Sequence, residues 1–161
     1  YYDGKDFSTS KYGEVIYDNE APVYNKLTIL NVTHLRENNA GGNEDITLVN
    51  VGDEIRILFN FKEKLLIEPV IKIGDIEKTL KLNTNYNSFG KYTYYADIKV
   101  TNDMFDADGE LNFEITDYAD IAGNTLDEPL TLNNVDRAKY SGVIVDTTPA
   151  NINGLMMRII N

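Results

Sequence analysis

The chain has 161 residues, a net charge of −11 at pH 7 and no cysteine. This length allows one domain with a core of its own and flanking segments, and the lack of cysteine excludes disulfides, cysteine nucleophiles and thiolate metal sites. The negative charge argues against nucleic acid as a partner, and no stretch is apolar enough for direct membrane insertion.

Alternation of apolar and polar residues predicts β-strands along most of the chain. Turns rich in Gly, Asn and Asp separate the alternating segments. The predicted strands are, in chain order, Leu27–Val32, Ile55–Phe61, Pro69–Ile73, Glu77–Leu82, Tyr92–Val100, Leu111–Ile115 and the segment 139–145. No helix is predicted, and Leu126–Ala138 is left open between a loop and a short helical turn. About seven short strands at this spacing predict an all-β fold, an immunoglobulin-like antiparallel β-sandwich.

One segment occurs twice. Lys11–Asp18 recurs as Lys139–Asp146 with the same Lys, Tyr, Val, Ile and Asp positions, and a proline follows each copy, at Pro22 and Pro149. The pattern predicts a strand that ends a domain, followed by a short joint that proline stiffens. We therefore expect a fragment of a tandem array. Its parts are the tail of a preceding repeat (1–17), one complete repeat (18–145) and the start of a following repeat (146–161).

The central segment carries a series of motifs in a fixed order. They are Gly52-Asp53 opening a strand that ends in Glu63, Pro69–Gly74, the tyrosine-rich Tyr92–Ala96, Asp106–Ile115 and Asp120-Ile121-Ala122-Gly123-Asn124. In this order they resemble the bacterial Ig-like domains that occur in tandem on large surface and secreted proteins. The run from Leu126 to Tyr140 is longer than in that family. The resemblance implies a non-catalytic spacer module of a bacterial protein that is secreted or anchored to the cell wall or surface, with neighbouring repeats as partners. The many Lys, Asn, Ile and Tyr residues favour a Gram-positive source.

Acidic residues gather at several places that could bind Ca²⁺, because this cation prefers six to eight oxygen ligands. The candidate ligands are Asp18, Asn19, Glu20 and Asp146 at the joints, Asp106, Asp108 and Glu110 around a turn glycine, and Asp117 and Asp120 near Asn124. Related arrays hold their modules rigid with cations between them, so the resemblance favours the joints. The alternatives stay open: a hydrated linker at the joints, a hairpin turn at Asp108-Gly109, and side chains that cap their own backbone in the third group.

Two further possibilities concern binding and cross-linking. An adhesive or carbohydrate-binding module for host proteins or glycans would present exposed aromatic rings, for which Tyr86 and Tyr95 are the candidates. Cysteine-free surface modules of Gram-positive bacteria sometimes carry a Lys–Asn isopeptide bond, but no set of residues stands out for one. We expect no enzymatic activity, because His34 is the only histidine and neither a serine elbow nor a phosphate-binding loop accompanies it.

Overall fold

The computed structural model describes residues 17–42, 45–85, 90–105, 107–146 and 148. Of these residues, 43% lie in strands and 9% in helices, so the prediction of an all-β fold is confirmed. In this part of the chain we find no helix of the length and apolar character that crossing a membrane requires. Tyr86 and Asp106 lie outside the described residues, as do most of the predicted flanking segments 1–17 and 146–161, of which only residues 17, 146 and 148 are described.

The elements are short, apart from three long strands near the middle of the largest sheet. In chain order they are β1 (Tyr24–Asn31), α2 (Val32–Asn39), β2 (Leu48–Val49), β3 (Glu54–Phe61), β4 (Leu65–Ile67), β5 (Val70–Ile73), β6 (Ile76–Thr79), β7 (Lys81–Leu82), β8 (Tyr92–Lys99), the 3₁₀ turn η1 (Asn102–Met104), β9 (Gly109–Glu110), β10 (Glu114–Thr116), β11 (Ala119–Asp120), β12 (Leu130–Thr131), β13 (Tyr140–Ser141) and β14 (Ile144–Val145).

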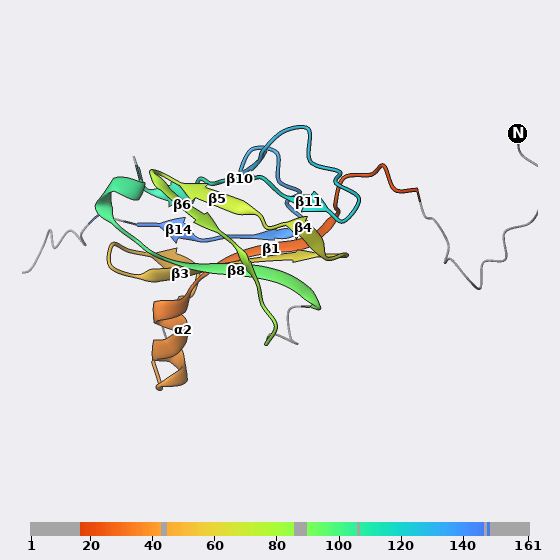
Figure 1. Ribbon diagram of the computed structural model, residues 1–161. Coiled ribbons are helices and arrows are strands. Elements are labelled where there is room, and N and C mark those ends of the chain that lie inside the picture. The colour runs from red at the N-terminus through yellow and green to blue at the C-terminus, as the bar shows by residue number, and fades with distance from the viewer. Residues whose placement is uncertain (1–16, 43–44, 86–89, 106, 147, 149–161) are drawn as a thin grey trace, which may run out of the picture.

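The strands form two main sheets, in the orders β13-β1-β3-β8-β7 and β12-β10-β5-β6, and two small ones, β2-β14-β9 and β11-β4. The second main sheet lies above the first in Figure 1, with β14 between them in this view. Antiparallel pairing joins β1 to β3 and β3 to β8, whereas β13 runs parallel to β1.

One hydrophobic core joins the two main sheets. Ile55, Ile57, Phe59 and Phe61 of β3 are at most 2% exposed and belong to one cluster with side chains of β5 and β10. The ring of Tyr118, which follows β10, lies with its centroid 5.7 Å from that of Phe59 and 5.1 Å from that of Phe61. Burial of these faces supplies the main favourable free energy of folding, and the alternation in the sequence identified β3 correctly.

The outer face of β3 departs from the simple alternation. The alternation along β3 would place Asn60 on the solvent side, but Asn60 is only 8% exposed. It accepts a hydrogen bond from Asn25 Nδ2 (2.9 Å) and donates through its own Nδ2 to Thr93 Oγ1 (3.0 Å). The chain at Gly90 crosses this position so closely that a Cβ there would lie 2.6 Å from Asn60 Nδ2. The backbone at Gly90 therefore covers the outer face of β3 at Asn60.

The prediction that the chain has no helix is wrong at α2, which projects away from the sheets (Figure 1). The first predicted strand ends at Asn31, one residue early, because the Asn31 side chain caps the helix by accepting from the His34 N–H (3.1 Å). Asn31 Nδ2 also donates to Asp53 Oδ2 (2.8 Å), and the Glu54 N–H donates to Thr33 Oγ1 (2.8 Å). These contacts fix the start of the helix against the β2–β3 turn.

The last part of the chain is more broken than expected. Leu126–Ala138 forms no helix; it consists of turns around the short strand β12, and Val135 fixes its position with a buried side chain. The predicted strand 139–145 divides at Gly142 into β13, which pairs with β1, and β14, which pairs with β2 and β9. A Cβ at position 142 would lie 1.9 Å from the Tyr140 hydroxyl, so any larger residue there would force the Tyr140 ring to move.

Candidate metal centre and the two joints

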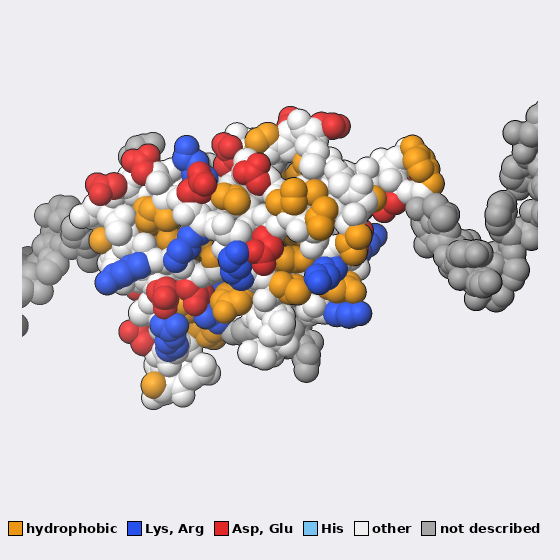
Figure 2. All heavy atoms as spheres, viewed as in Figure 1, with side chains coloured by type: hydrophobic (Ala, Val, Ile, Leu, Met, Phe, Trp, Pro, Cys, Tyr) orange, Lys and Arg blue, Asp and Glu red, His pale blue; other side chains and the backbone are white. Residues whose placement is uncertain are grey.

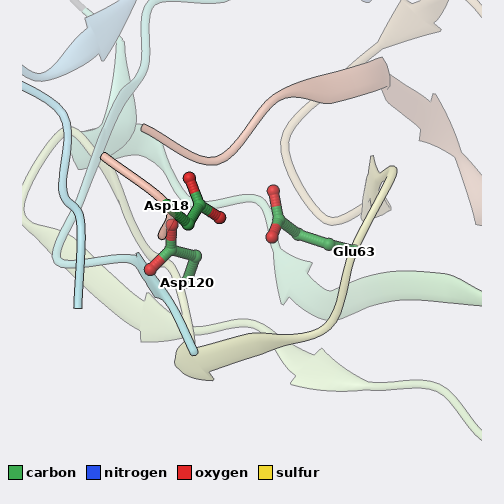
Figure 3. A group of neighbouring side chains, drawn as sticks. All are labelled: Asp18, Glu63 and Asp120. Carbon is green, nitrogen blue, oxygen red and sulfur yellow. The ribbon is translucent and has the colours of Figure 1, made fainter. Parts of the chain in front are cut away.

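Three carboxylates meet where the described chain enters the module. Oxygens of Asp18, Glu63 and Asp120 all lie within 4.8 Å of one another. Figure 3 shows the three side chains pointing toward a common space, each from a different segment. Asp18 belongs to the first joint, Glu63 follows β3, and Asp120 ends β11. They are the only such group of acidic or histidine side chains among the residues that the structure describes.

Local hydrogen bonds explain why these segments converge. The Lys62 N–H donates to the Val23 carbonyl (3.1 Å), which holds the end of β3 against the chain that enters β1. The Asp120 N–H donates to the Asn124 carbonyl (3.1 Å), and Gly123, at φ 90°, closes the tight turn between them. A left-handed φ favours glycine, so the Asp-x-Ala-Gly-Asn sequence has a direct structural cause.

Asp120 is fully buried and ionised. Burial by itself raises the pKa of a carboxyl group, but hydrogen bonds from the Asn124 side chain and from backbone N–H groups, including those of Gly123 and Ala122, outweigh it and lower the pKa of Asp120 below its ordinary value. The Asn124 N–H donates to Oδ1 (2.9 Å) and Asn124 Nδ2 to Oδ2 (2.8 Å). The same Nδ2 donates to the Asp18 carbonyl (3.2 Å), so Asn124 links the turn to the joint.

Among the described residues, no lysine or arginine forms an ion pair with Asp18, Glu63 or Asp120. Neighbouring carboxylates repel one another, most strongly where burial limits solvent screening. A set of oxygen donors without nitrogen or sulfur suits a hard cation such as Ca²⁺. The arrangement can therefore hold a divalent cation whose other ligands are water or further oxygens.

The second joint repeats the local geometry of the first. The Glu20 N–H donates to Asp18 Oδ1, and the Thr148 N–H donates to Asp146 Oδ1; both distances are 3.1 Å. Each is an Asx turn, in which the side chain hydrogen-bonds its own backbone two residues on. The surroundings differ, because Thr148 Oγ1 also donates to Asp108 Oδ2.

The remaining predicted ligands lie elsewhere. Glu20 contributes no carboxylate to the acidic group, and Glu110 forms an ion pair with Arg137. Asp117 Oδ2 accepts from Thr116 Oγ1 (2.9 Å). Sequence reasoning placed Asp18 and Asp120 in separate groups and missed Glu63. One feature of the sequence could have pointed to Glu63: it is the acidic residue that ends the alternating strand.

Two aromatic side chains were predicted to bind a ligand: Tyr86 lies outside the described residues, and one face of the Tyr95 ring is covered. The Arg56 guanidinium lies over the Tyr95 ring, 5.5 Å from its centroid. Lysine ammonium groups lie similarly over Tyr92 (Lys91, 4.9 Å) and Tyr24 (Lys139, 5.0 Å). These cation–π contacts occupy one face of each ring.

His34 lies in α2 rather than in a loop. Its Nδ1 is 2.7 Å from the Asp45 carbonyl and its Nε2 is 3.7 Å from Asp53 Oδ2. Thr33, the neighbouring hydroxyl, accepts a backbone hydrogen bond instead of facing the imidazole. These contacts anchor the helix to the segment at Asp45 and to the β2–β3 turn.

Comparison with protein-family models, with curated proteins and with solved structures finds no match to this chain. The resemblance to bacterial Ig-like domains therefore depends on the order of the motifs and stays a prediction.

Proposed function

We propose that the chain is a non-catalytic, immunoglobulin-like structural module of an extracellular bacterial protein, in which such modules follow one another and calcium stiffens the joints between them. The module would act as a spacer that holds another part of the protein away from the surface. Its contribution is mechanical: a joint that cannot bend keeps successive modules in line.

The observation that carries the proposal is the meeting of Asp18, Glu63 and Asp120. Asp18 belongs to the joint, whereas Glu63 and Asp120 belong to the body of the module. A cation shared by the three would tie the entering chain to the body and remove the freedom of the joint to bend. Without the cation, repulsion between the carboxylates favours an open joint.

The second joint supports the idea of an array. Asp146, the counterpart of Asp18 in the repeated segment, forms the same Asx turn at the same distance. The chain therefore leaves the module in the local conformation in which it enters. A following module would receive Asp146 as this one receives Asp18.

Thermal unfolding of the full chain with and without calcium tests the proposal. Calcium at 100 times its dissociation constant stabilises a one-site protein by about 2.7 kcal/mol, so we expect a clear rise in Tm that magnesium reproduces only weakly. Asp120→Asn should abolish the rise, because it removes a charged ligand while keeping the side-chain shape.

Asp117→Asn is the matched control, since Asp117 lies three residues away and outside the acidic group. Its φ of 60° is one that asparagine adopts readily. An unchanged Tm at millimolar calcium, or an equal loss of the response in both variants, would refute the calcium joint.

A further inference from the structure

One edge of the largest sheet is open along half of its length. β8 pairs with β3 over all of its eight residues, but on its other side β7 pairs only with Tyr94 and Tyr95. From Ala96 to Lys99, no strand of the described chain pairs with this side of β8. Such an edge presents backbone N–H and C=O groups that can pair with a strand of another chain.

The edge is open because the neighbouring chain changes sheets at Leu80. This residue alone separates β6, at the edge of the second main sheet, from β7, at the edge of the first. Leu80 is fully buried, and its N–H donates to the Pro69 carbonyl (2.7 Å). In the register of the β7–β8 pairing, Thr79 and Glu77 would continue along β8, but both pair with β5 instead. Figure 1 shows β6 beside β5 in the upper sheet.

Lys78 of β6 reaches the open edge from the other sheet. It lies opposite the buried Ile71 in the β5–β6 pairing, so its side chain starts on the core-facing side of that sheet. Its Nζ donates to the Asp97 carbonyl of β8 (2.9 Å). The Asn83 N–H donates to the Thr93 carbonyl (2.8 Å), and because carbonyls alternate along a strand, the Asp97 carbonyl points to the same side. Lys78 therefore occupies an acceptor of the open edge.

We infer that Lys78 prevents the open edge of β8 from pairing with the same edge of a second copy of this chain. A strand that added there would displace the ammonium group from the Asp97 carbonyl and enclose it, and burying an unpaired charge is unfavourable. Charges that point inward at a sheet edge oppose strand addition in this way. Figure 2 shows basic and acidic side chains together on the face where Figure 1 places β6 and β8.

The edge is complementary to a second copy of itself. Two antiparallel β8 strands related by a two-fold axis at Ile98 would place Asp97 of one copy opposite Lys99 of the other, twice. Opposite charges in directly opposed positions stabilise an antiparallel pair. The Arg56 Nε holds the Asp97 carboxylate on the outer face of the sheet (2.6 Å), where a lysine of the second copy would meet it. Without Lys78, the second copy is therefore the occupant that this edge fits.

Sedimentation of Lys78→Met in calcium-free buffer tests the inference. Methionine keeps an unbranched side chain but has no charge and no N–H donor. We expect the wild type to stay monomeric and Lys78→Met to dimerise, with an association constant at least about tenfold higher. Lys78→Arg keeps a charged donor and should stay monomeric.

Lys72→Met is the matched control, because Lys72 is exposed on β5 and its loss changes the net charge equally. It should stay monomeric: the chain already carries a charge of −11, so removing a positive charge by itself opposes association. An association constant of Lys78→Met no higher than that of the wild type, or equal association of Lys72→Met, would overturn the inference. Lys78→Thr is a second variant with the same expected result as Lys78→Met.

Amide exchange locates the contact in the associated variant. The backbone amides of Asp97 and Lys99 should exchange at least about tenfold more slowly in the Lys78→Met dimer than in the wild type, because pairing protects them. Adding Lys99→Glu should return the variant to the monomer, since acidic residues would then face each other across the pair. Unchanged exchange at both amides in a dimer, or a dimer that persists with Lys99→Glu, would refute pairing at this edge.

Discussion

The two ends of the module use the same turn in different surroundings. At the entry, the Asx turn at Asp18 lies against two more carboxylates of the module body. At the exit, the equivalent turn at Asp146 rests on Asp108 through the Thr148 hydroxyl. The turn itself is therefore a property of the joint sequence, whereas the acidic environment comes from the module that the joint enters.

The two copies of the repeated segment also differ at one decisive position. Gly142 of the second copy corresponds to Glu14 of the first. In the second copy the Tyr140 ring, packed 5.6 Å from the Phe113 ring, brings its hydroxyl over Gly142. The hydroxyl is buried and has no hydrogen-bond partner among the described residues, and burial raises the pKa of Tyr140 to about 12. The sequence repeat therefore does not include the glycine over which the Tyr140 hydroxyl lies.

The largest effect is expected from Gly142→Ala at the exit. The added Cβ would lie 1.9 Å from the Tyr140 hydroxyl, so the ring must move and the β13–β14 segment must shift. Overpacking of this kind costs about 1–3 kcal/mol, measured as a change in the free energy of unfolding in urea. The neighbouring Ser141→Ala should change it little, because Ser141 is exposed. In a Tyr140→Ala background the cost of Gly142→Ala should largely vanish; full additivity of the two changes would show that the ring is not the cause.

Local sequence patterns predicted the main strands but did not predict the helix α2. Ile55–Phe61 was predicted because its period-two pattern is strong and both main sheets bury that face. Helix α2 begins with two β-branched residues, which favour strands. What starts it is the Asn31 cap, and Asn31 is held by Asp53 from a distant turn. Contacts of that kind do not appear in local patterns.

The candidate site was predicted in pieces. Asp18 and Asp120 were both proposed as calcium ligands, but their meeting depends on the packing of the β3 end and the β11 turn against the entering chain. Glu63 completes the group from a third segment. Spacing along the chain cannot reveal this, because the three positions share no local periodicity.

A smaller effect concerns how the stability of the fold at the entry depends on pH. The pKa of Asp120 lies below its ordinary value of 3.8, so its ionised form stabilises the fold. That contribution is complete above about pH 4 and disappears as the pH falls through the folded-state pKa. We therefore expect Asp120→Asn to lower the urea midpoint in metal-free buffer by a constant amount down to about pH 4, with the difference shrinking below it. A difference that grew on acidification would contradict this assignment.

The smallest effect compares the two turns directly. Asparagine keeps the side-chain oxygen that accepts the Asx hydrogen bond but removes the charge. Asp18→Asn should therefore stabilise the calcium-free protein by about 0.5 kcal/mol, because it relieves repulsion from Glu63 and Asp120 at a partly solvated site. Asp146→Asn should be close to neutral in the same buffer. With calcium, Asp18→Asn should instead destabilise the protein, because it removes one of the three charged ligands. Asp146→Asn keeps all three ligands and should stay close to neutral. Equal responses of the two variants in both buffers would mean that the two joints share one environment, and that the contrast between the ends is absent in solution.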